Sequence, residues 1–346
     1  MKSLHKIDCT NKHVLVRVDF NIDIHALTNQ VESFRLTLTK DTVAYILGFP
    51  GARVTLITHL GRPGGKKDMQ FSTKPLQKVL ENIFGETVSF TPDCLESDDF
   101  TESRIALREN IRFYPEEEAN ESMFAEKLSA DFDVYVNEAF SVSHRAHASI
   151  VAITHFLPSF AGLHLQKELI ELTKVLLEPA RPAVAILGGA KIKTKLPLIH
   201  VFEKHYDFVL LGGIIANEAL DKKIVFQENV LLPMDFRNEE RLDIGDATIK
   251  KYENTIAQAK TILWNGPLGK FEEQPYDTGT SAIVNAITKA DAYTIAGGGE
   301  SLTAIQKAGA FDKFDIISSG GGAMLSYLSE EKLPGLEALN ASASLS

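Results

Sequence analysis

The sequence predicts an α/β protein with two doubly wound (Rossmann-like) parallel-sheet lobes joined by an interdomain helix. Its 346 residues are too many for one ordinary hydrophobic core, so two domains are expected. Short apolar runs alternate with helical patterns along both halves, which is typical of parallel sheets with crossover helices. The second half also repeats one unit, in which an apolar strand is followed by glycines and then by a helix.

The first half, residues 1–158, contains runs with the apolar composition of buried strands and helical patterns between them. The predicted strands cover residues 13–20, 53–59, 104–108 and 133–136, and two of the predicted helices cover 39–47 and 76–84. Strands that alternate with helices imply parallel pairing, because a crossover helix must carry the chain back before each new strand. The first half is therefore expected to form one parallel sheet.

A long amphipathic stretch separates the two halves. Residues 159–178 form the predicted connector helix, which is closed by Pro179 and Pro182. The second half, residues 179–325, then runs through five strand–glycine units. These units are AVAILGGAK (183–191), FVLLGGIIAN (208–217), TILWNGPLG (261–269), YTIAGGG (293–299) and DIISSGGGA (315–323).

Bulk composition argues against several classes of function. A net charge of −10 argues against nucleic acid as the main partner. No apolar run reaches the roughly 18 residues that a membrane-spanning helix needs, and the N-terminal residues lack a signal-peptide pattern. Cys9 and Cys94 have no CxxC partner, which argues against a disulfide framework or a thiolate zinc site. We therefore expect a cytoplasmic protein with no membrane partner.

Arginine is concentrated in the first half of the chain. Eight of the eleven arginines lie among the first 150 residues, which suits a local site for anions but is also explained by surface ion pairs. Ligands of open α/β sheets bind beyond the carboxyl ends of the strands. The polar residues that follow the predicted strands, or open a helix beside them, are Asp19, Asn21, Arg35, His59, Arg62, Arg112 and Arg145.

The arginines of this set favour a pocket for a polyanion. Clustered guanidinium groups repel one another unless an anion bridges them, and their geometry suits phosphate and carboxylate. Any single arginine is explained as well by a surface ion pair, so the prediction rests on the whole set. His144 and His147 are three residues apart, but no acidic or thiol partner stands at helix spacing, which argues against zinc.

Lysines and glycines carry the chemistry of the second half. Lys191 and Lys195 are four residues apart, on one face of a helix that opens after a buried strand. Cations in a first helical turn face the positive end of the helix dipole, so contact with phosphate is favoured over a solvated face. Glycines at 212–213, 297–299 and 320–322 leave backbone amides free for a nucleotide, although a tight turn alone also requires glycine.

Glu300 directly follows the glycines at 297–299 and is placed to hold Mg²⁺ on the phosphates. Its alternative role is that of a carboxylate stabilising a helix start. The motifs GxxxxGK[ST] and GxGxxG and the protein-kinase signatures are absent, so a nucleotide would bind without a P-loop. A polyanion pocket in one half and a nucleotide site in the other predict phosphoryl transfer across an interdomain cleft.

Eight short sequence motifs follow one another over nearly the whole chain, in the order in which one known family carries them. They are VLVRVDFN (14–21), HLGRP (59–63), ENIRF (109–113), VNEAF…HRAHAS (136–149), AILGGAK (185–191), WNGPLG (264–269), GGGES (297–301) and SSGGGA (318–323). Any one of them could be accidental, but the ordered set is specific. On these motifs the chain resembles the phosphoglycerate kinases.

The resemblance implies a kinase with a carboxyl group as acceptor. The reaction implied is reversible phosphoryl transfer from 1,3-bisphosphoglycerate to Mg-ADP, giving 3-phosphoglycerate and ATP, in glycolysis and gluconeogenesis. It implies direct in-line transfer after hinge closure, with phosphoglycerate on the N-terminal lobe (1–158) and Mg-ADP or Mg-ATP on the C-terminal lobe (179–325). It also implies a monomer whose C-terminal segment, 326–346, packs back on the N-terminal lobe.

Site residues follow from the resemblance position by position. Those that look like phosphoglycerate ligands are Asp19, Asn21, Arg35, His59, Arg62, Arg112 and Arg145. Those that look like nucleotide ligands are Lys191, Lys195, Gly212, Gly213, Asn265, Pro267, Glu272, Gly297, Gly298, Gly299, Glu300, Ser301, Gly320 and Gly321. Arg35, Lys191 and Lys195 look like the catalytic residues. Glu300 looks like the Mg²⁺ ligand.

The chain departs from the family pattern in three places. Glu300 and Ser301 stand where Asp and Thr are usual, and Ser141 stands where Gly is usual. The chain is also short, with an abrupt stretch over 219–232 as though a helix and loop had been deleted. A catalytically weak member that binds nucleotide or phosphoglycerate is therefore an alternative. A second alternative is a dinucleotide-dependent oxidoreductase. The missing GxGxxG motif and the paired lysines argue against it.

Overall fold

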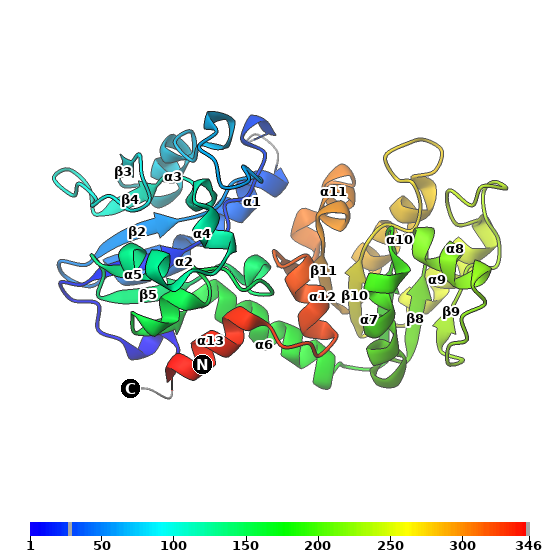
Figure 1. The fold of residues 1–346 in the computed structure, drawn as a ribbon. Coiled ribbons are helices and arrows are strands. Elements are labelled where there is room, and N and C mark those ends of the chain that lie inside the picture. Colours follow the sequence, from blue (N-terminus) through cyan, green and yellow to red (C-terminus); the bar gives the residue numbers. More distant parts are fainter. Residues whose placement is uncertain (27–29, 344–346) are drawn as a thin grey trace. The chain divides into compact units, whose positions relative to one another are not determined.

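The computed structural model describes residues 1–26 and 30–343. The chain divides into two compact units, the first made of Met1–Leu169 with the segment from Lys332 onward, and the second of Ile170–Glu331 (Figure 1). Each unit is built on a six-stranded sheet, and the named strands of both sheets pair in parallel. The predicted α/β class with two doubly wound lobes is confirmed. No helix in the described ranges has the length and apolar composition needed to span a membrane.

The sheet of the first unit has the strand order β3-β4-β2-β1-β5-β6. Its strands are β1 (His13–Arg17), β2 (Arg53–Ile57), β3 (Val88–Thr91), β4 (Ile105–Arg108), β5 (Val134–Asn137) and β6 (Ser159–Ala161). The chain order reverses at β1, which pairs with β2 on one side and with β5 on the other. The crevice expected for a ligand therefore lies beyond the carboxyl ends of β1 and β5.

Helices cover this first sheet. They are α1 (Gln30–Thr37), α2 (Lys40–Leu47), α3 (Leu76–Phe84), α4 (Pro115–Glu118), α5 (Ser122–Ser129) and, after the second unit, α13 (Pro334–Ala343). The predicted helix over 76–84 coincides with α3, which ends at Gly85 in the left-handed conformation. The predicted strand over 13–20 is longer than β1, because the chain leaves the sheet after Arg17 to form the loop that carries Asp19.

The sheet of the second unit has the order β12-β11-β10-β7-β8-β9. Its strands are β7 (Ala183–Leu187), β8 (Phe208–Leu211), β9 (Val230–Leu231), β10 (Thr261–Asn265), β11 (Tyr293–Gly297) and β12 (Ile316–Ser318). The order reverses between β7 and β10, which pair along their whole lengths. Gly188 and Asn265, at the ends of these two strands, are therefore neighbours.

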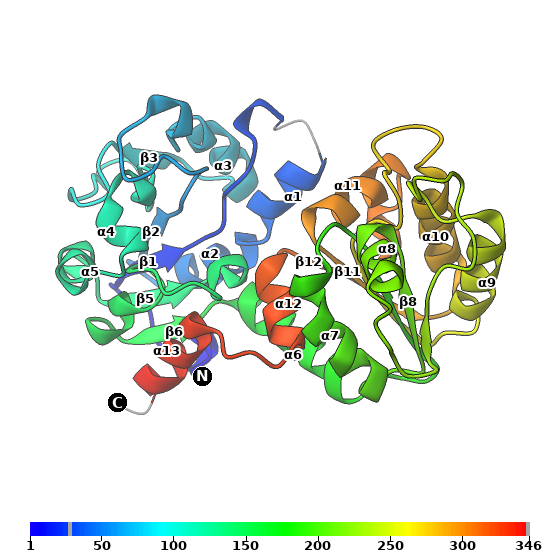
Figure 2. The ribbon, with the colours of Figure 1, turned by 45° about the vertical axis from the view of Figure 1, so that its right-hand side comes forward.

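The helices of the second unit form two groups. They are α7 (Ile192–His205), α8 (Gly213–Asp221), α9 (Asp246–Ile256), α10 (Thr278–Lys289), α11 (Gly299–Lys307) and α12 (Gly322–Leu328). Contacts join α12, α7 and α8 on one face of the sheet, and α9, α10 and α11 on the other (Figure 2). The turns before α11 and α12 require glycine, because Gly298 and Gly321 have φ values of 96° and 42°. These turns bring the helix N-termini to the carboxyl edge of the sheet.

The connector differs from the helix predicted over 159–178. Residues Ser159–Ala161 form β6, and the helix α6 (Leu163–Leu177) begins only after Gly162. The buried carboxylate of Glu138 explains this start, because it accepts hydrogen bonds from the backbone N–H groups of His164 and Leu165. An ideal Cβ at Gly162 would lie 1.8 Å from Glu138 Oε2, so only glycine admits the carboxylate.

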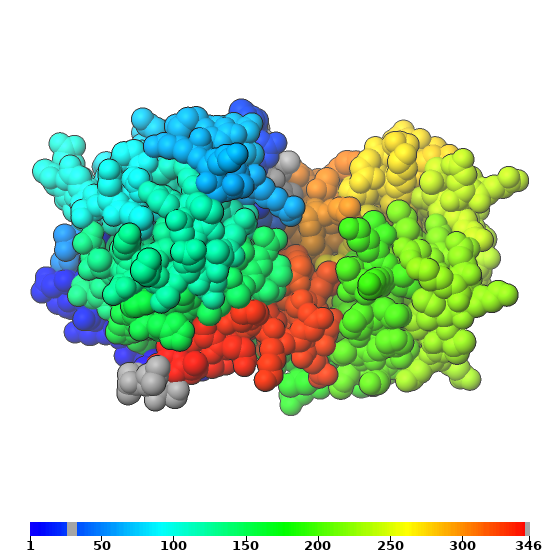
Figure 3. Space-filling view, viewed as in Figure 1, coloured from blue at the N-terminus to red at the C-terminus, as the bar shows by residue number. Residues whose placement is uncertain are grey.

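The C-terminal segment also differs in extent from the 326–346 predicted to return to the first lobe. The helix α12 belongs to the second unit, and the return begins at Lys332. The helix α13 contacts β6 and the 3-10 helix η6 (Ala152–His155), both of the first unit. In Figure 3 the red atoms of this segment lie against green atoms of the first unit. Apolar side chains such as Leu333 and Leu339 are buried in this segment, which gives the return its hydrophobic driving force.

Removing the carboxylate at the start of α6 should destabilise the protein. Glu138 accepts hydrogen bonds from Thr42 Oγ1, His164 N and Leu165 N, so Glu138→Ala leaves several buried donors without an acceptor. We expect the free energy of unfolding in urea to fall by about 2–3 kcal/mol. Glu138→Gln keeps an acceptor oxygen and should lose clearly less. Equal stabilities of Glu138→Ala and the wild-type protein would contradict this account of the helix start.

Candidate functional site

A first group of polar side chains lies beyond the carboxyl end of β1. Asp19 Oδ2 accepts a hydrogen bond from Arg35 Nη1 at 3.3 Å and another from the hydroxyl of Ser141. The same Arg35 nitrogen donates to the carbonyl of Asn21 at 3.4 Å. Asn21 Oδ1 in turn accepts from the backbone N–H of Gly61 at 2.8 Å. Residues from three predicted loops and α1 are thus joined at one edge of the sheet.

Arg112 extends this group and is almost completely buried. It lies on the 3-10 helix η4 (Ile111–Phe113), and its Nη1 donates to the carbonyl of Gly61 at 2.9 Å. Its Nε lies 3.1 Å from a carboxylate oxygen of Glu118, although the geometry is not that of a hydrogen bond. Burial, and the charges of nearby arginines, lower the pKa of Arg112 to about 10. Its Nη2 is buried with no hydrogen-bond partner in the described chain, which leaves binding capacity for an anion.

His59 is 2% exposed and lies at the centre of the arginines. Burial lowers its pKa well below the usual range, and the charges of Arg17, Arg112 and Arg145 lower it further. Arg17 Nη2 lies 3.2 Å from His59 Nδ1. The same causes, burial first, lower the pKa of His147 to about 3. The imidazole rings therefore stay uncharged among fixed positive charges.

The two remaining predicted residues of the first unit, Arg145 and Arg62, are held by fewer interactions. Arg145 Nε donates to His144 Nε2 at 3.3 Å, and its charge reaches His59 and Arg112. Arg62 is exposed, and within residues 1–26 and 30–343 it has no hydrogen bond or ion pair. The structure thus gathers Asp19, Asn21, Arg35, His59, Arg112 and Arg145 without tying Arg62 to them.

Arg17 and Ser141 belong to this site and were not among the predicted residues. Arg17 is a charged residue inside an apolar strand pattern. This is a signal that the sequence offers, because burying a charge is costly and a charged residue at such a position indicates that the charge has a role. Ser141 is marked in the sequence only as a departure from the Gly that is usual at its position, and this does not identify its partner. Its contact with Asp19 spans 122 residues, so only the folded chain reveals it.

In the second unit, two adjoining cavities open at the carboxyl edge of the sheet. The first, which we call the lysine cavity, has a volume of about 400 Å³. Its lining includes the predicted residues Lys191, Lys195, Asn265, Gly298, Gly299, Glu300, Ser301 and Gly321. The second, which we call the Glu272 cavity, has a volume of about 370 Å³, and Gly213, Pro267, Glu272 and Glu300 line it. Both cavities share Gly189, Ala190 and Glu300.

Lys195 joins the carboxyl ends of β7 and β10, where the strand order reverses. Its Nζ donates to the carbonyls of Gly188 and Asn265 and to Asn265 Oδ1. All three N–H groups of the ammonium are therefore used within the protein. Burial lowers its pKa to about 8, against the opposing effect of Glu300. Lys195 contributes positive charge to the cavity wall without offering an unused donor.

The position of Lys191 differs from the prediction that both lysines lie within the helix. It is the N-cap residue of α7 with an extended backbone, and its side chain is exposed at the lysine cavity. Its ammonium is therefore available to a ligand in a way that the ammonium of Lys195 is not.

Several of the predicted nucleotide residues have packing roles, and three of them line neither cavity. Ser301 Oγ accepts from the backbone N–H of Gly266 and so fixes the turn after β10. An ideal Cβ at Gly212 would lie 2.4 Å from Leu268, and one at Gly297 would lie 2.2 Å from the sulfur of Met324. Gly212, Gly297 and Gly320 are absent from the walls of both cavities.

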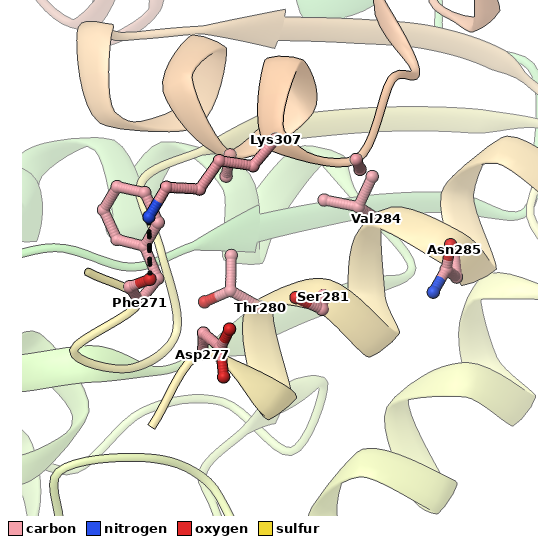
Figure 4. A pocket seen from close by; sticks show the side chains of 9 residues that line it. Phe271, Asp277, Thr280, Ser281, Val284, Asn285 and Lys307 are labelled. Carbon is pink, nitrogen blue, oxygen red and sulfur yellow. Dashed lines mark hydrogen bonds between the residues drawn. The ribbon is translucent and has the colours of Figure 1, made fainter. Parts of the chain in front are cut away.

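Lys307, the last residue of α11, contacts the loop that carries Glu272. Lys307 Nζ donates to the carbonyl of Phe271 at 3.3 Å and lies 4.9 Å from the centre of its ring (Figure 4). A further cavity of about 230 Å³ lies between these residues and α10, lined by Asp277, Thr280 and others. Lys307 thus holds the residue that directly precedes Glu272.

Glu300 is a single carboxylate at the lysine cavity. No cluster of three or more His, Cys, Asp or Glu side chains suited to a metal occurs within the described residues. One carboxylate beside a cavity for phosphates nevertheless fits Mg²⁺, because this ion is usually held by one or two carboxylates together with substrate phosphates and water.

Comparison with known proteins finds relatives over nearly the whole chain. The family model described as phosphoglycerate kinase matches residues 4–232 and 226–331. The phosphoglycerate kinase of Bartonella henselae is 38% identical over 393 aligned positions, covering 98% of each chain. That of Moorella thermoacetica is 36% identical over 388 positions, covering 97% of this chain and 98% of the relative.

Solved structures agree in fold. The phosphoglycerate kinase of Coxiella burnetii matches with a TM-score of 0.84 and 29% identity, covering 98% of each chain. That of Pyrococcus horikoshii OT3 matches with a TM-score of 0.86 and 28% identity, covering 99% of this chain and 100% of the other. The sequence alignments are longer than the 346 residues of this chain, so the relatives contain residues that it lacks. The two segments of the family match meet at 226–232, inside the stretch 219–232 where we expect a deletion.

The buried neutral histidines should make stability depend on pH. His147 is held neutral in the folded protein, whereas it titrates near its ordinary pKa of about 6.5 when unfolded. The unfolded state therefore binds more protons below that pH, so stability is full above about pH 6.5 and falls as the pH falls. We expect His147→Gln to weaken the loss of unfolding free energy between pH 6.5 and 5 by about 1 kcal/mol, after allowance for screening.

Urea unfolding at several pH values measures this difference. His155→Gln is the matched control, since the His155 side chain is exposed. An identical pH dependence in the wild-type protein and in His147→Gln would contradict the prediction.

Proposed function

The chain belongs to the phosphoglycerate kinase family, and we propose that its two units supply the two substrate sites of that family's phosphoryl transfer. The chain is a phosphotransferase that uses ATP and ADP. For the acceptor we propose the carboxylate of 3-phosphoglycerate, whose oxygen attacks the γ-phosphorus of ATP as the bond to ADP breaks. The reverse reaction returns the phosphoryl group of 1,3-bisphosphoglycerate to ADP.

The phosphoglycerate site is proposed at the carboxyl edge of the first sheet. The observation that carries this proposal is the cluster of buried cations around His59, in which Arg112 Nη2 has no partner in the described chain. Such a cluster is unfavourable unless an anion compensates it. The proposed ligands are Asp19, Asn21, Arg35, His59, Arg62, Arg112 and Arg145. The place of Arg62 in this set rests on sequence alone.

The nucleotide site is proposed in the two cavities of the second unit. The lysine cavity suits the phosphates, since Lys191 and the glycine turns line it and the first N–H groups of α11 are not used within the helix. The Glu272 cavity suits the nucleoside, because it combines apolar walls with the carboxylate of Glu272. The two cavities adjoin at Gly189, so one extended ligand can occupy both.

Mg²⁺ is proposed as the cofactor, with Glu300 as its protein ligand. The bound ion would neutralise charge on the nucleotide phosphates. Glu300 lies beside Gly189, where an ideal Cβ would be 3.7 Å from its Oε2. Its extra methylene relative to the usual Asp is compatible with this position at the cavity wall.

Rate enhancement is proposed to come from positioning and charge. Arg35, Lys191 and Lys195 would stabilise the transferring phosphoryl group, which needs little covalent chemistry from the protein. Because Lys195 is already bound to Gly188 and Asn265, its part is that of a fixed positive charge. Transfer requires the two sites to meet, so we propose hinge closure involving α6. A monomeric state and a cytoplasmic location stay predictions from sequence.

The alternative of a weak, purely binding member of the family is not favoured. It was motivated by Glu300 and by the shortened stretch near 219–232. Both cavities are nevertheless formed, and the cationic residues of both sites are present.

The decisive experiment is ADP release from Mg-ATP with and without 3-phosphoglycerate, with hydroxylamine to trap the acyl phosphate. We expect release that depends on both Mg²⁺ and 3-phosphoglycerate, together with formation of the hydroxamate. Folded protein that binds Mg-ADP by calorimetry but releases no ADP would support the binding-only alternative instead.

Arg35→Ala should reduce kcat far more than it raises KM for 3-phosphoglycerate. Arg35 is half-buried against Asp19, and a donor that acts on the developing charge contributes mainly in the transition state. We expect kcat to fall by about 10²–10³-fold. Arg104→Ala, which removes a surface ion pair with Glu86, is the matched control and should leave kcat unchanged. An unchanged kcat in Arg35→Ala would remove this residue from the transition-state role.

Lys195 should impose a basic limit on nucleotide use. Its pKa of about 8 means that the free enzyme loses this positive charge above pH 8. We expect kcat/KM for Mg-ATP to fall about tenfold per pH unit above that value. Lys195→Arg keeps its charge throughout, so its profile should lack this limb even if its absolute rate is lower. The same limb in both proteins would assign it to another group.

A further inference from the structure

Arg17 is a buried cation that offers only hydrogen-bond donors. It ends β1 and is 0% exposed. Its Nε donates to Ser149 Oγ at 2.8 Å, its Nη1 donates to the carbonyl of Val18, and its Nη2 faces His59 Nδ1 at 3.2 Å. An arginine in a protein keeps its protons and accepts none. Every partner of Arg17 must therefore act as an acceptor.

The orientation of Arg17 is fixed from the other side by Glu117 and Ser149. Glu117 is completely buried, and its two oxygens accept from the backbone N–H of Ser149 at 2.8 Å and from Ser149 Oγ at 2.6 Å. The hydroxyl proton of Ser149 is thus directed to Glu117, which leaves a lone pair for Arg17. The carboxylate also supplies the opposite charge that a buried guanidinium requires.

This chain of hydrogen bonds determines the state of His59. Because Nδ1 must accept from Arg17, it cannot carry a proton, and in a neutral imidazole the proton is then on Nε2. Protonation of both nitrogens would direct an N–H of His59 against an N–H of Arg17. The charges of Arg112 and Arg145, which act on the ring from other elements, oppose protonation as well. His59 Nε2 has no hydrogen-bond partner among the described residues.

We propose that Arg17 is a positioning residue that holds His59 as the neutral Nε2–H tautomer, so that His59 donates one directed hydrogen bond to the bound phosphoglycerate anion. This inference rests on the phosphoglycerate site proposed above. A neutral donor adds directional recognition to the pocket without adding another positive charge to the arginine cluster. Its hydrogen-bonding state also stays constant over the pH range in which an ordinary histidine titrates.

The tautomer can be measured directly on the full-length free protein. Long-range ¹H–¹⁵N correlation spectra distinguish a protonated ring nitrogen from an accepting one, and His59→Gln assigns the signal among the ten histidines. We expect Nδ1 to be the accepting nitrogen and Nε2 the protonated one, unchanged from pH 5.5 to 9. The opposite tautomer, or titration near pH 6.5, would overturn the proposal.

Two variants of His59 separate the donor from the acceptor. Glutamine places an amide near the position of Nε2 but loses the acceptor for Arg17, whereas asparagine keeps an acceptor near Nδ1 and loses the donor. By calorimetry with 3-phosphoglycerate, we expect His59→Gln to bind within about threefold of the wild-type protein and His59→Asn to bind tenfold or more weakly. The reverse order would overturn the donor role.

The binding data also separate this inference from the proposed function. If the wild-type protein does not bind 3-phosphoglycerate, the proposed site fails and the donor role fails with it, while the spectra still decide the tautomer. If the wild-type protein binds but both variants bind equally well, the proposed site stands and the inference is overturned. Arg17→Met removes the donor that faces Nδ1, so the Nδ1–H tautomer should become populated, and an unchanged tautomer in the folded variant would overturn the positioning role.

Discussion

Parallel pairing of the strands is the constraint on which both candidate sites depend. In a parallel sheet the carboxyl ends of neighbouring strands meet at one edge, and the loops beyond them converge there. The strand order of each sheet reverses once, at β1 in the first unit and between β7 and β10 in the second. Asp19 and the ammonium group of Lys195 lie at these two places. Sites assembled from residues far apart in sequence follow directly from this topology.

Charge burial distinguishes the two edges. The first unit gathers guanidinium groups around His59 and balances part of their charge with buried carboxylates such as Glu117. The second unit buries one ammonium, that of Lys195, and satisfies it with two carbonyls and an amide oxygen. Both arrangements cost desolvation energy that apolar residues would not. At these edges the charges lie beyond strands whose buried positions are largely filled by apolar side chains.

The departures from the family pattern have local consequences. Ser141 adds a hydroxyl that donates to Asp19, so the carboxylate is held from two sides. Ser301 supports the turn at Gly266, a task for which a hydroxyl suffices. The relatives contain residues that this chain lacks, and the Glu272 cavity is nevertheless formed.

The sequence by itself determined the α/β class, most strand and helix positions and the polar residues at the strand ends, because hydrophobic periodicity and glycine turns are local signals. It did not reveal the short strands β3 and β9. It also missed β6, since three residues between Pro158 and Gly162 continue the apolar pattern of the following helix. It also could not pair Arg17 with His59 or Lys195 with Asn265, which are 42 and 70 residues apart. Those pairings depend on which strands are neighbours. Only the tertiary structure decides strand order, and with it the protonation and orientation of the buried groups.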